Sequence, residues 1–158
     1  MIYLEATRRA WEIAVNEAVL CHAQKIKPAH LLMGIAKLCE GDANSGNVDE
    51  IARVRAFFAD AWLDGTSFRC RLRRIVTLPG DRVPSEVMHR SVTAKVVFGR
   101  TEKLATPDEA ARPVLQLRHL LQAFRTNKLH EDSGPIQRVI RCQSDTLGAH
   151  GKTKGERH

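Results

Sequence analysis

The amino-acid sequence predicts an all-α protein in which two pseudo-symmetric helical repeats pack into one bundle-like domain. Three observations lead to this prediction. Apolar residues recur at steps of three and four over most of the chain, which is the period of an amphipathic helix. The alternation of apolar and polar residues that is typical of strands appears nowhere at convincing length. A ten-residue segment recurs 89 residues further along the chain, and 158 residues are enough for two such units around one core.

Four helices are predicted in the first half of the chain. The longest covers about residues 4–24, and one of its faces is formed by Thr7, Trp11, Ala14, Ala18 and Cys21. Pro28 favours a new helix start, so we expect the second helix over about residues 30–39. The third helix is expected over about residues 48–63. A short fourth helix is expected over about residues 68–76.

The second half of the chain begins after residues 78–81, where Pro and Gly interrupt regular structure. A long helix is predicted over about residues 85–104, with an apolar face formed by Val87, Met88, Val92, Val96 and Val97. Further helices are predicted over about residues 114–125 and 136–142. Residues 143–158 contain few hydrophobic residues and are predicted to form a flexible basic tail.

The recurring segment covers residues 26–35 and 115–124. Each copy has an aliphatic residue, three further residues, His-Leu-Leu, one residue, a small residue and a large hydrophobic residue. The motif positions are Ile26, His30, Leu31 and Leu32 in the first copy and Leu115, His119, Leu120 and Leu121 in the second. The small residue lets a neighbouring helix approach closely, and the leucines supply buried area. We therefore expect two units, over about residues 4–77 and 84–142, that share one core within a domain of residues 1–142.

This spaced pattern resembles the double repeat at the amino terminus of Clp-type AAA+ unfoldases such as ClpA and ClpC. The resemblance is carried by the stretch 14–18, which reads Ala-Val-Asn-Glu-Ala, by Ile26 and by the His-Leu-Leu segment that begins at His30. It extends over about residues 5–142. The resemblance implies a helical domain that docks adaptors or protein substrates, delivers them to an ATPase ring and catalyses nothing itself.

Two features depart from the family pattern. The ATPase modules are missing, and Gly151-Lys152-Thr153 is not a phosphate-binding loop, because position 146 is Thr where the loop requires Gly. Several family members have Glu directly before each motif histidine, and in one branch this acid helps to recognise phosphoarginine. The corresponding residues here are Ala29 and Arg118, which cannot pair with a guanidinium. Arg118 would instead favour an acidic partner.

The chain is basic, with a net charge of +7 and a pI near 9.6. Its densest cationic cluster consists of Arg69, Arg71, Arg73 and Arg74, which a helix would place close enough together to contact phosphate groups. The simpler interpretation is a solvated helix face that pairs in part with Asp60 or Asp64. We prefer the simpler interpretation, because aromatic residues are few and no nucleic-acid-binding motif accompanies the cluster.

Other chemistries lack the residue patterns that they need. The scattered cysteines Cys21, Cys39, Cys70 and Cys142 do not have metal-ligand spacing and are expected to be reduced. The motif histidines have no evident nucleophile or carboxylate partner, so we expect imidazoles near a helix start that bond to backbone or to a neighbouring residue. No apolar run is long enough to span a bilayer, and the first residues do not form a secretory signal. We therefore expect a cytoplasmic protein without catalytic, cofactor or metal sites.

These observations favour a non-catalytic module that binds a protein or peptide, namely a Clp-type ATPase, an adaptor or a client. The module could be an adaptor or regulator of Clp-dependent proteolysis. The groove between the two repeats is the expected binding surface. The alternative is a small nucleic-acid-binding regulator that uses the helix containing Arg69, Arg71, Arg73 and Arg74.

Overall fold

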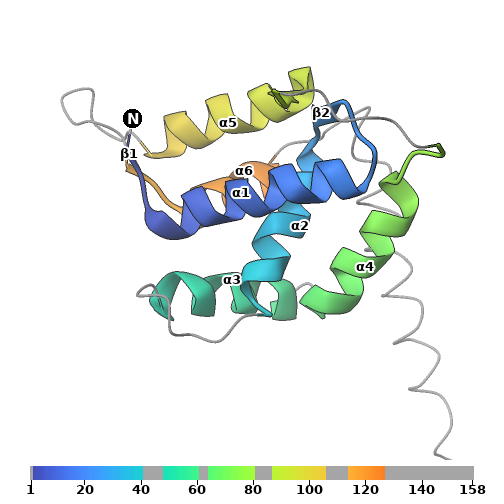
Figure 1. The fold of residues 1–158 in the computed structure, drawn as a ribbon. Coiled ribbons are helices and arrows are strands. Elements are labelled where there is room, and N and C mark those ends of the chain that lie inside the picture. The colour runs from blue at the N-terminus through green and yellow to red at the C-terminus, as the bar shows by residue number, and fades with distance from the viewer. Residues whose placement is uncertain (1, 41–47, 61–63, 81–86, 106–113, 127–158) are drawn as a thin grey trace, which may run out of the picture.

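The structure is a computed structural model, and it describes residues 2–40, 48–60, 64–80, 87–105 and 114–126. Helices dominate these residues, as predicted (Figure 1). The elements in chain order are β1 (Ile2–Tyr3), α1 (Glu5–Leu20), β2 (Lys25–Ile26), α2 (Pro28–Leu38), α3 (Val48–Asp60), α4 (Gly65–Val76), β3 (His89–Arg90), α5 (Val92–Ala105), β4 (Val114–Leu115) and α6 (Leu117–Thr126). We call β1 to α2 the first half and β3 to α6 the second half. Each half has the order strand, helix, strand, helix.

The short strands join the two halves. β1 pairs in parallel with β4, and β2 pairs in parallel with β3, so the first strand of each half pairs with the second strand of the other. The adjacent hydrogen bonds are also reciprocal. The N–H of Leu4 donates to the carbonyl of Leu115 at 3.2 Å, and the N–H of Ser91 donates to the carbonyl of Ile26 at 2.9 Å. Because the strand pairs and these hydrogen bonds are reciprocal, the two halves are related by a pseudo-two-fold axis. The predicted fold class is confirmed.

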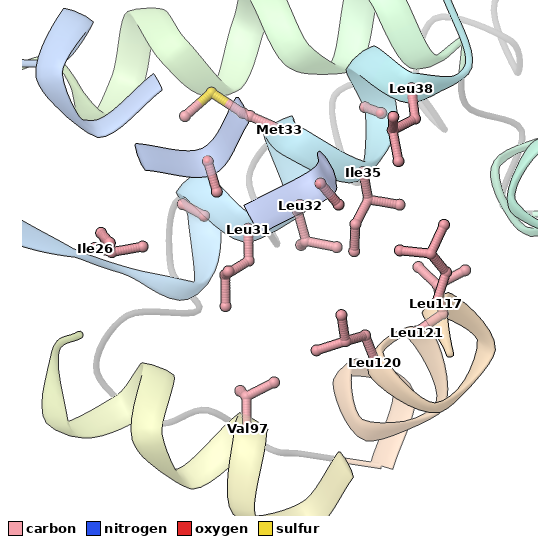
Figure 2. Packing of buried hydrophobic residues seen from close by; sticks show 14 of the residues in the cluster. Ile26, Leu31, Leu32, Met33, Ile35, Leu38, Val97, Leu117, Leu120 and Leu121 are labelled. Atoms are coloured by element: carbon pink, nitrogen blue, oxygen red, sulfur yellow. The ribbon is translucent and has the colours of Figure 1, made fainter. Parts of the chain in front are cut away.

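The two copies of the His-Leu-Leu segment meet in one core. Leu31 and Leu32 of α2 and Leu120 and Leu121 of α6 are buried in the same hydrophobic cluster, where Figure 2 shows them facing a common interior. The strand residues of the motif, Ile26 and Leu115, are also fully buried. Burial of aliphatic side chains is the main stabilising contribution to such a fold. The core therefore depends on both halves together.

Helix α1 ends at Leu20, four residues earlier than predicted. His22 has a φ of 54°, in the left-handed region, and its N–H donates to the carbonyl of Val19 at 2.9 Å. The N–H of Ala23 donates to the carbonyl of Ala18, also at 2.9 Å. These two bonds form a Schellman motif, which ends a helix and is usually built around glycine. The sequence has no glycine here, so this end was not evident from composition.

Helix α5 begins later than predicted, and three of the five residues of its predicted apolar face are exposed. Residues 89–90 form β3, and the Ser91 hydroxyl accepts a hydrogen bond from the N–H of Ala94 at 3.1 Å, which caps the helix start. Val92 is 77% exposed, and Val87 and Val96 are exposed as well. Val97 is buried as predicted, and Met88 packs partly buried against the core. The rest of the buried face of α5 consists of Ala94, Phe98 and Thr101.

The remaining predicted helices that fall within the described residues agree in type but differ in their limits. The helix predicted over residues 114–125 begins at Leu117, because the two residues of β4 precede it. The predicted helix over 136–142 and the predicted tail over 143–158 lie outside the described residues. Within the part of the chain that the structure describes, no helix is both long and apolar enough to cross a membrane.

Candidate peptide-binding cleft

Two aromatic rings meet where the halves face each other. Trp11 lies in α1, seven residues after Leu4, and Phe98 lies in α5, seven residues after Ser91. Leu4 and Ser91 make the reciprocal hydrogen bonds described above, so Trp11 and Phe98 occupy equivalent positions in the two halves. Their ring centroids are 5.4 Å apart, with an angle of 81° between the ring planes. This edge-to-face contact is a favourable arrangement for aromatic pairs.

The guanidinium of Arg90 lies over both rings. Its Cζ atom is 4.8 Å from the centroid of Phe98 and 5.9 Å from that of Trp11, and these are cation–π distances. Arg90 belongs to β3, and its backbone is aligned with Ile26 of β2. The strand pairing therefore positions the arginine, and the ring contacts hold its side chain in one place.

These residues border a cleft between α1 and α5 with a volume of about 250 Å³. Its lining consists of Thr7, Arg8, Trp11, Arg90 and Phe98. Thr7 is buried, and its hydroxyl donates to the carbonyl of Leu115 at 3.1 Å, so it contributes a wall that is already hydrogen-bonded. The cleft therefore has an apolar, aromatic interior and two cationic side chains. Such a site can hold an apolar group and place an anion beside it.

The sequence did not identify these residues as a site. The spacing of Trp11 within its helix indicated a core position, and Trp11 does pack against the core, but it also lines the cleft. The signal that could have found the site is the equivalence of Trp11 and Phe98 in the two halves. The two copies of the His-Leu-Leu segment are separated along the chain by a different number of residues than α1 and α5. Aligning the copies therefore does not place Trp11 on Phe98, whereas aligning the first strand of each half does.

The motif histidines lie near helix starts and contact backbone. Nδ1 of His30 accepts a hydrogen bond from the N–H of Lys27 at 3.0 Å, and Nδ1 of His119 accepts one from the N–H of Gln116 at 3.4 Å. An imidazole that accepts at Nδ1 is in its neutral form. Burial lowers the pKa of His119, and the nearby positive charge of Arg118 lowers this pKa further. Both histidines therefore support helix geometry.

Ala29 and Arg118, which precede these histidines, have different surroundings. Ala29 is buried in the core and offers little surface to a partner, whereas Arg118 is exposed. Neither residue lines the cleft between α1 and α5. The structure therefore does not bring these two positions together with Trp11 and Phe98.

The arginine cluster of α4 is divided between the interior and the surface. Arg69 is buried, and it donates two hydrogen bonds to the carboxylate of Glu40, from Nε at 2.7 Å and from Nη2 at 2.9 Å. Nη1 of Arg69 donates to the carboxylate of Glu17 at 3.3 Å, and Glu17 also accepts a hydrogen bond from Nε of Arg73 at 2.8 Å. Arg71 and Arg74 are exposed. Arg69 and Arg73 therefore attach α4 to α1 and to the end of α2.

The acidic partners of this cluster differ from those expected. Glu17 and Glu40 pair with the arginines, whereas Asp64 accepts the N–H of Ser67 at 2.9 Å and caps the start of α4. Hydrogen bonds from Ser67 lower the pKa of Asp64, as expected for a capping carboxylate. The sequence indicated Asp64 because it is close to the arginines along the chain. The carboxylates that pair with Arg69, those of Glu40 and Glu17, lie 29 or more residues from it in the sequence.

The cysteines within the described residues are free thiols. Cys21 is buried, Cys39 is half-buried and Cys70 is exposed, while Cys142 lies outside the described residues. Burial raises the pKa of Cys39 to about 11, so this thiol is protonated at neutral pH. No group of three or more potential metal ligands occurs among the residues that the structure describes.

The fold is similar to that of the Hsp104 N-terminal domain from Candida albicans, which is known from a crystal structure. The TM-score is 0.57 at 16% sequence identity, and the match covers 94% of this chain and 92% of the other. The neighbour is a domain of the Clp N-terminal type, in agreement with the fold that the repeated motif implied. No family model matches the sequence, and no curated protein matches it.

Proposed function

We propose that this protein is a non-catalytic module that binds a segment of another protein in the cleft between α1 and α5. The observation that carries the proposal is the cleft itself, with Trp11 and Phe98 in contact and Arg90 above them. Tryptophan and arginine are enriched among the residues that dominate binding energy at protein interfaces. The similarity to the Hsp104 N-terminal domain supports the proposal, because the resemblance to Clp N-terminal domains implies protein docking.

The size of the cleft favours a short peptide segment as the ligand. A volume of about 250 Å³ is smaller than a typical drug-sized ligand pocket, which is roughly 300–1,000 Å³. One or two apolar side chains from an extended segment would fill it. The module would therefore hold a client or adaptor through a small anchor, in keeping with a role in delivering proteins to a Clp-type ATPase.

A fluorescence titration tests the proposal. The chain contains two tryptophans, so in the variant Trp62→Phe the only tryptophan is Trp11, inside the cleft. We expect a saturable change in Trp11 emission when this variant is titrated with a reduced and alkylated, permanently unfolded protein. Binding of fluorescein-labelled peptides, measured by anisotropy, then identifies the segments that bind.

Substitution of the aromatic anchor provides the decisive comparison. In the anisotropy assay, Trp11→Ala is expected to weaken binding about tenfold or more, which corresponds to roughly 1.4 kcal/mol. Ile75→Ala is the matched control, because Ile75 is an exposed apolar residue of α4 that does not line the cleft. Circular dichroism confirms that both variants are folded. Equal affinities for the wild type, Trp11→Ala and Ile75→Ala would show that the cleft is not the binding site.

A further inference from the structure

The positive charge at the cleft is not neutralised by the fold. Among the ion pairs of the described residues, none involves Arg90. Nε of Arg8 lies 3.7 Å from Glu12, but the two side chains are 69% and 62% exposed, so this pair is weak and easily exchanged. In α4, by contrast, Arg69 and Arg73 are satisfied by Glu17 and Glu40. The cleft therefore presents cationic groups that are available to a ligand.

We infer that the cleft selects peptide segments in which a bulky apolar side chain stands next to an acidic side chain. This inference rests on the proposed function and specifies the ligand of the same cleft. The apolar side chain would pack against the partly exposed Trp11, which Phe98 supports from below, while the carboxylate accepts hydrogen bonds from the Arg90 guanidinium. Arginine offers a planar fork of donors that matches both oxygens of a carboxylate.

The placement of Arg90 makes this recognition efficient. The side chain is held over two aromatic rings and its backbone is held by strand pairing, so it loses little conformational freedom when a ligand binds. No ion pair of the described residues uses the Arg90 guanidinium, so its N–H groups can donate to a carboxylate. Arg8, at the border of the same cleft, adds long-range attraction for an acidic segment, as does the net charge of +7.

The same residues are less suited to a nucleic acid. Proteins that bind single strands use exposed aromatic faces on which bases stack. Here Arg90 lies over Phe98, and Trp11 and Phe98 contact each other at 5.4 Å. Phe98 is also buried, so of these two rings only Trp11 is partly exposed and successive bases would lack a second ring on which to stack. An apolar side chain with a neighbouring carboxylate needs only one ring and one guanidinium, which Trp11 and Arg90 supply, so the observations favour an acidic peptide.

Matched peptides test the inference. Three labelled peptides, acetylated and amidated at their ends, contain the same apolar anchor followed by Glu, Gln or Lys. We expect the Glu peptide to bind the wild type about fivefold more tightly than the Gln peptide, a difference of about 1 kcal/mol, and the Lys peptide to bind most weakly. The preference for Glu should decrease between 0.05 and 0.5 M salt, because exposed charges are screened.

Two arginine variants assign the preference to one side chain. In Arg90→Gln the ratio of the Glu and Gln affinities is expected to fall to about one. Arg71→Gln removes one exposed arginine of α4, outside the cleft, and is expected to keep the wild-type ratio. Because both variants lower the net charge equally, a loss of preference in both would reflect overall charge and would overturn the inference.

The outcomes separate this inference from the proposed function. If the Glu and Gln peptides bind the wild type equally and Trp11→Ala still weakens both, the acidic preference is wrong but the cleft remains the peptide site. If Trp11→Ala changes neither peptide, the proposed function fails. Two results would contradict the inference alone: displacement of the Glu peptide by a single-stranded oligonucleotide, and equally tight binding of a Gln peptide with a free carboxyl terminus.

Discussion

The two halves of the molecule share one order of strands and helices, but their main helices pack with different side chains. In the first half, Gly34 of α2 lies so close to α1 that an added Cβ atom would overlap the carbonyl oxygen of Ala10 and lie 3.0 Å from the nitrogen of Ala14. In the second half the equivalents of Ala10 and Ala14 are the larger Val97 and Thr101. The repeated motif therefore specifies the topology, while residue size sets the distance between helices.

The halves also differ in what attaches to them. Glu17 of α1 is buried and binds Arg69 and Arg73 of α4, so a charged network holds an additional helix against the first half. The equivalent residue in α5 is Leu104, which packs against the hydrophobic core. Equivalent positions in a duplicated fold can thus hold either a buried ion pair or an apolar contact.

Removal of Glu17 is expected to have the largest effect on stability. Glu17→Ala would leave the buried Arg69 and the half-buried Arg73 without their shared carboxylate. Breaking a buried ion pair from one side costs about 3–5 kcal/mol, and we expect a loss near 3 kcal/mol in the free energy of unfolding, because Arg73 is partly exposed and Arg69 keeps its bonds to Glu40. Urea denaturation followed by circular dichroism measures this loss.

The comparison between the halves provides the control for Glu17. Leu104→Ala removes a half-buried apolar side chain at the equivalent position, and we expect a smaller loss of about 1–2 kcal/mol. Equal losses in the two variants, or a loss below about 1 kcal/mol for Glu17→Ala, would mean that the charged network does not hold α4 in place.

Substitution of Gly34 is expected to have the second-largest effect. Alanine is a better helix former than glycine by about 1 kcal/mol, but in Gly34→Ala the new methyl group would meet the backbone of α1, which cannot rotate away. Overpacking of this kind costs about 1–3 kcal/mol, and we expect a net loss of about 2 kcal/mol because α1 and α2 must separate. Thermal and urea denaturation measure the change.

Ala123 occupies the position equivalent to Gly34 in the second half, and it is fully buried. Ala123→Gly therefore makes the opposite substitution, the loss of a methyl group, at the equivalent position. We expect a loss of about 1 kcal/mol, mainly from helix propensity. If Gly34→Ala were as stable as the wild type, the close approach of α1 and α2 would not be required by the fold.

The parts of the fold that follow from local pattern were predictable, and the parts that depend on distant residues were not. The faces of α1 and the paired leucines of α2 and α6 are spaced at the helical period, so their burial could be predicted. The strands are two residues long and are defined only by their partners. The exposed Val92 and Val96 misled the prediction for α5, because hydrophobic residues at helical spacing need not face the core.

The cleft was not predictable for a related reason. Trp11 of α1 is distant in the chain from Arg90 of β3 and Phe98 of α5, and none of the three belongs to a recognisable motif. The groove between the repeats was expected as a binding surface, but its lining depends on how far each half rotates against the other. The arginines of α4 stood out in the sequence because they are adjacent, and adjacency carries no information about buried partners such as Glu17.

The starts of α2 and α6 give the subtlest difference between the halves and the smallest expected effect. Pro28 begins α2 and has no N–H to satisfy. Leu117 holds the equivalent position in α6, and its N–H donates to the Glu50 carboxylate of α3 at 3.1 Å. Burial of Glu50 raises its pKa, and the bond from Leu117 and the charges of Arg118 and Arg53 only partly oppose this shift. The second half therefore uses a buried carboxylate where the first half uses proline.

The pH dependence of stability tests this difference. Because the pKa of Glu50 is higher in the folded than in the unfolded chain, the folded state binds the proton more tightly. Between the ordinary glutamate pKa of about 4.3 and the raised value, Glu50 therefore makes the free energy of unfolding decrease as pH rises. Glu50→Gln keeps an oxygen that can accept from Leu117 but does not ionise. We expect this variant to gain stability relative to the wild type as pH increases from 4 to 8, measured by urea denaturation.

Subtracting the two profiles cancels the opposite contribution of His119, whose lowered pKa makes stability increase with pH below about 6.5. A difference that is constant with pH would show that Glu50 ionises as easily in the folded protein as in the unfolded chain.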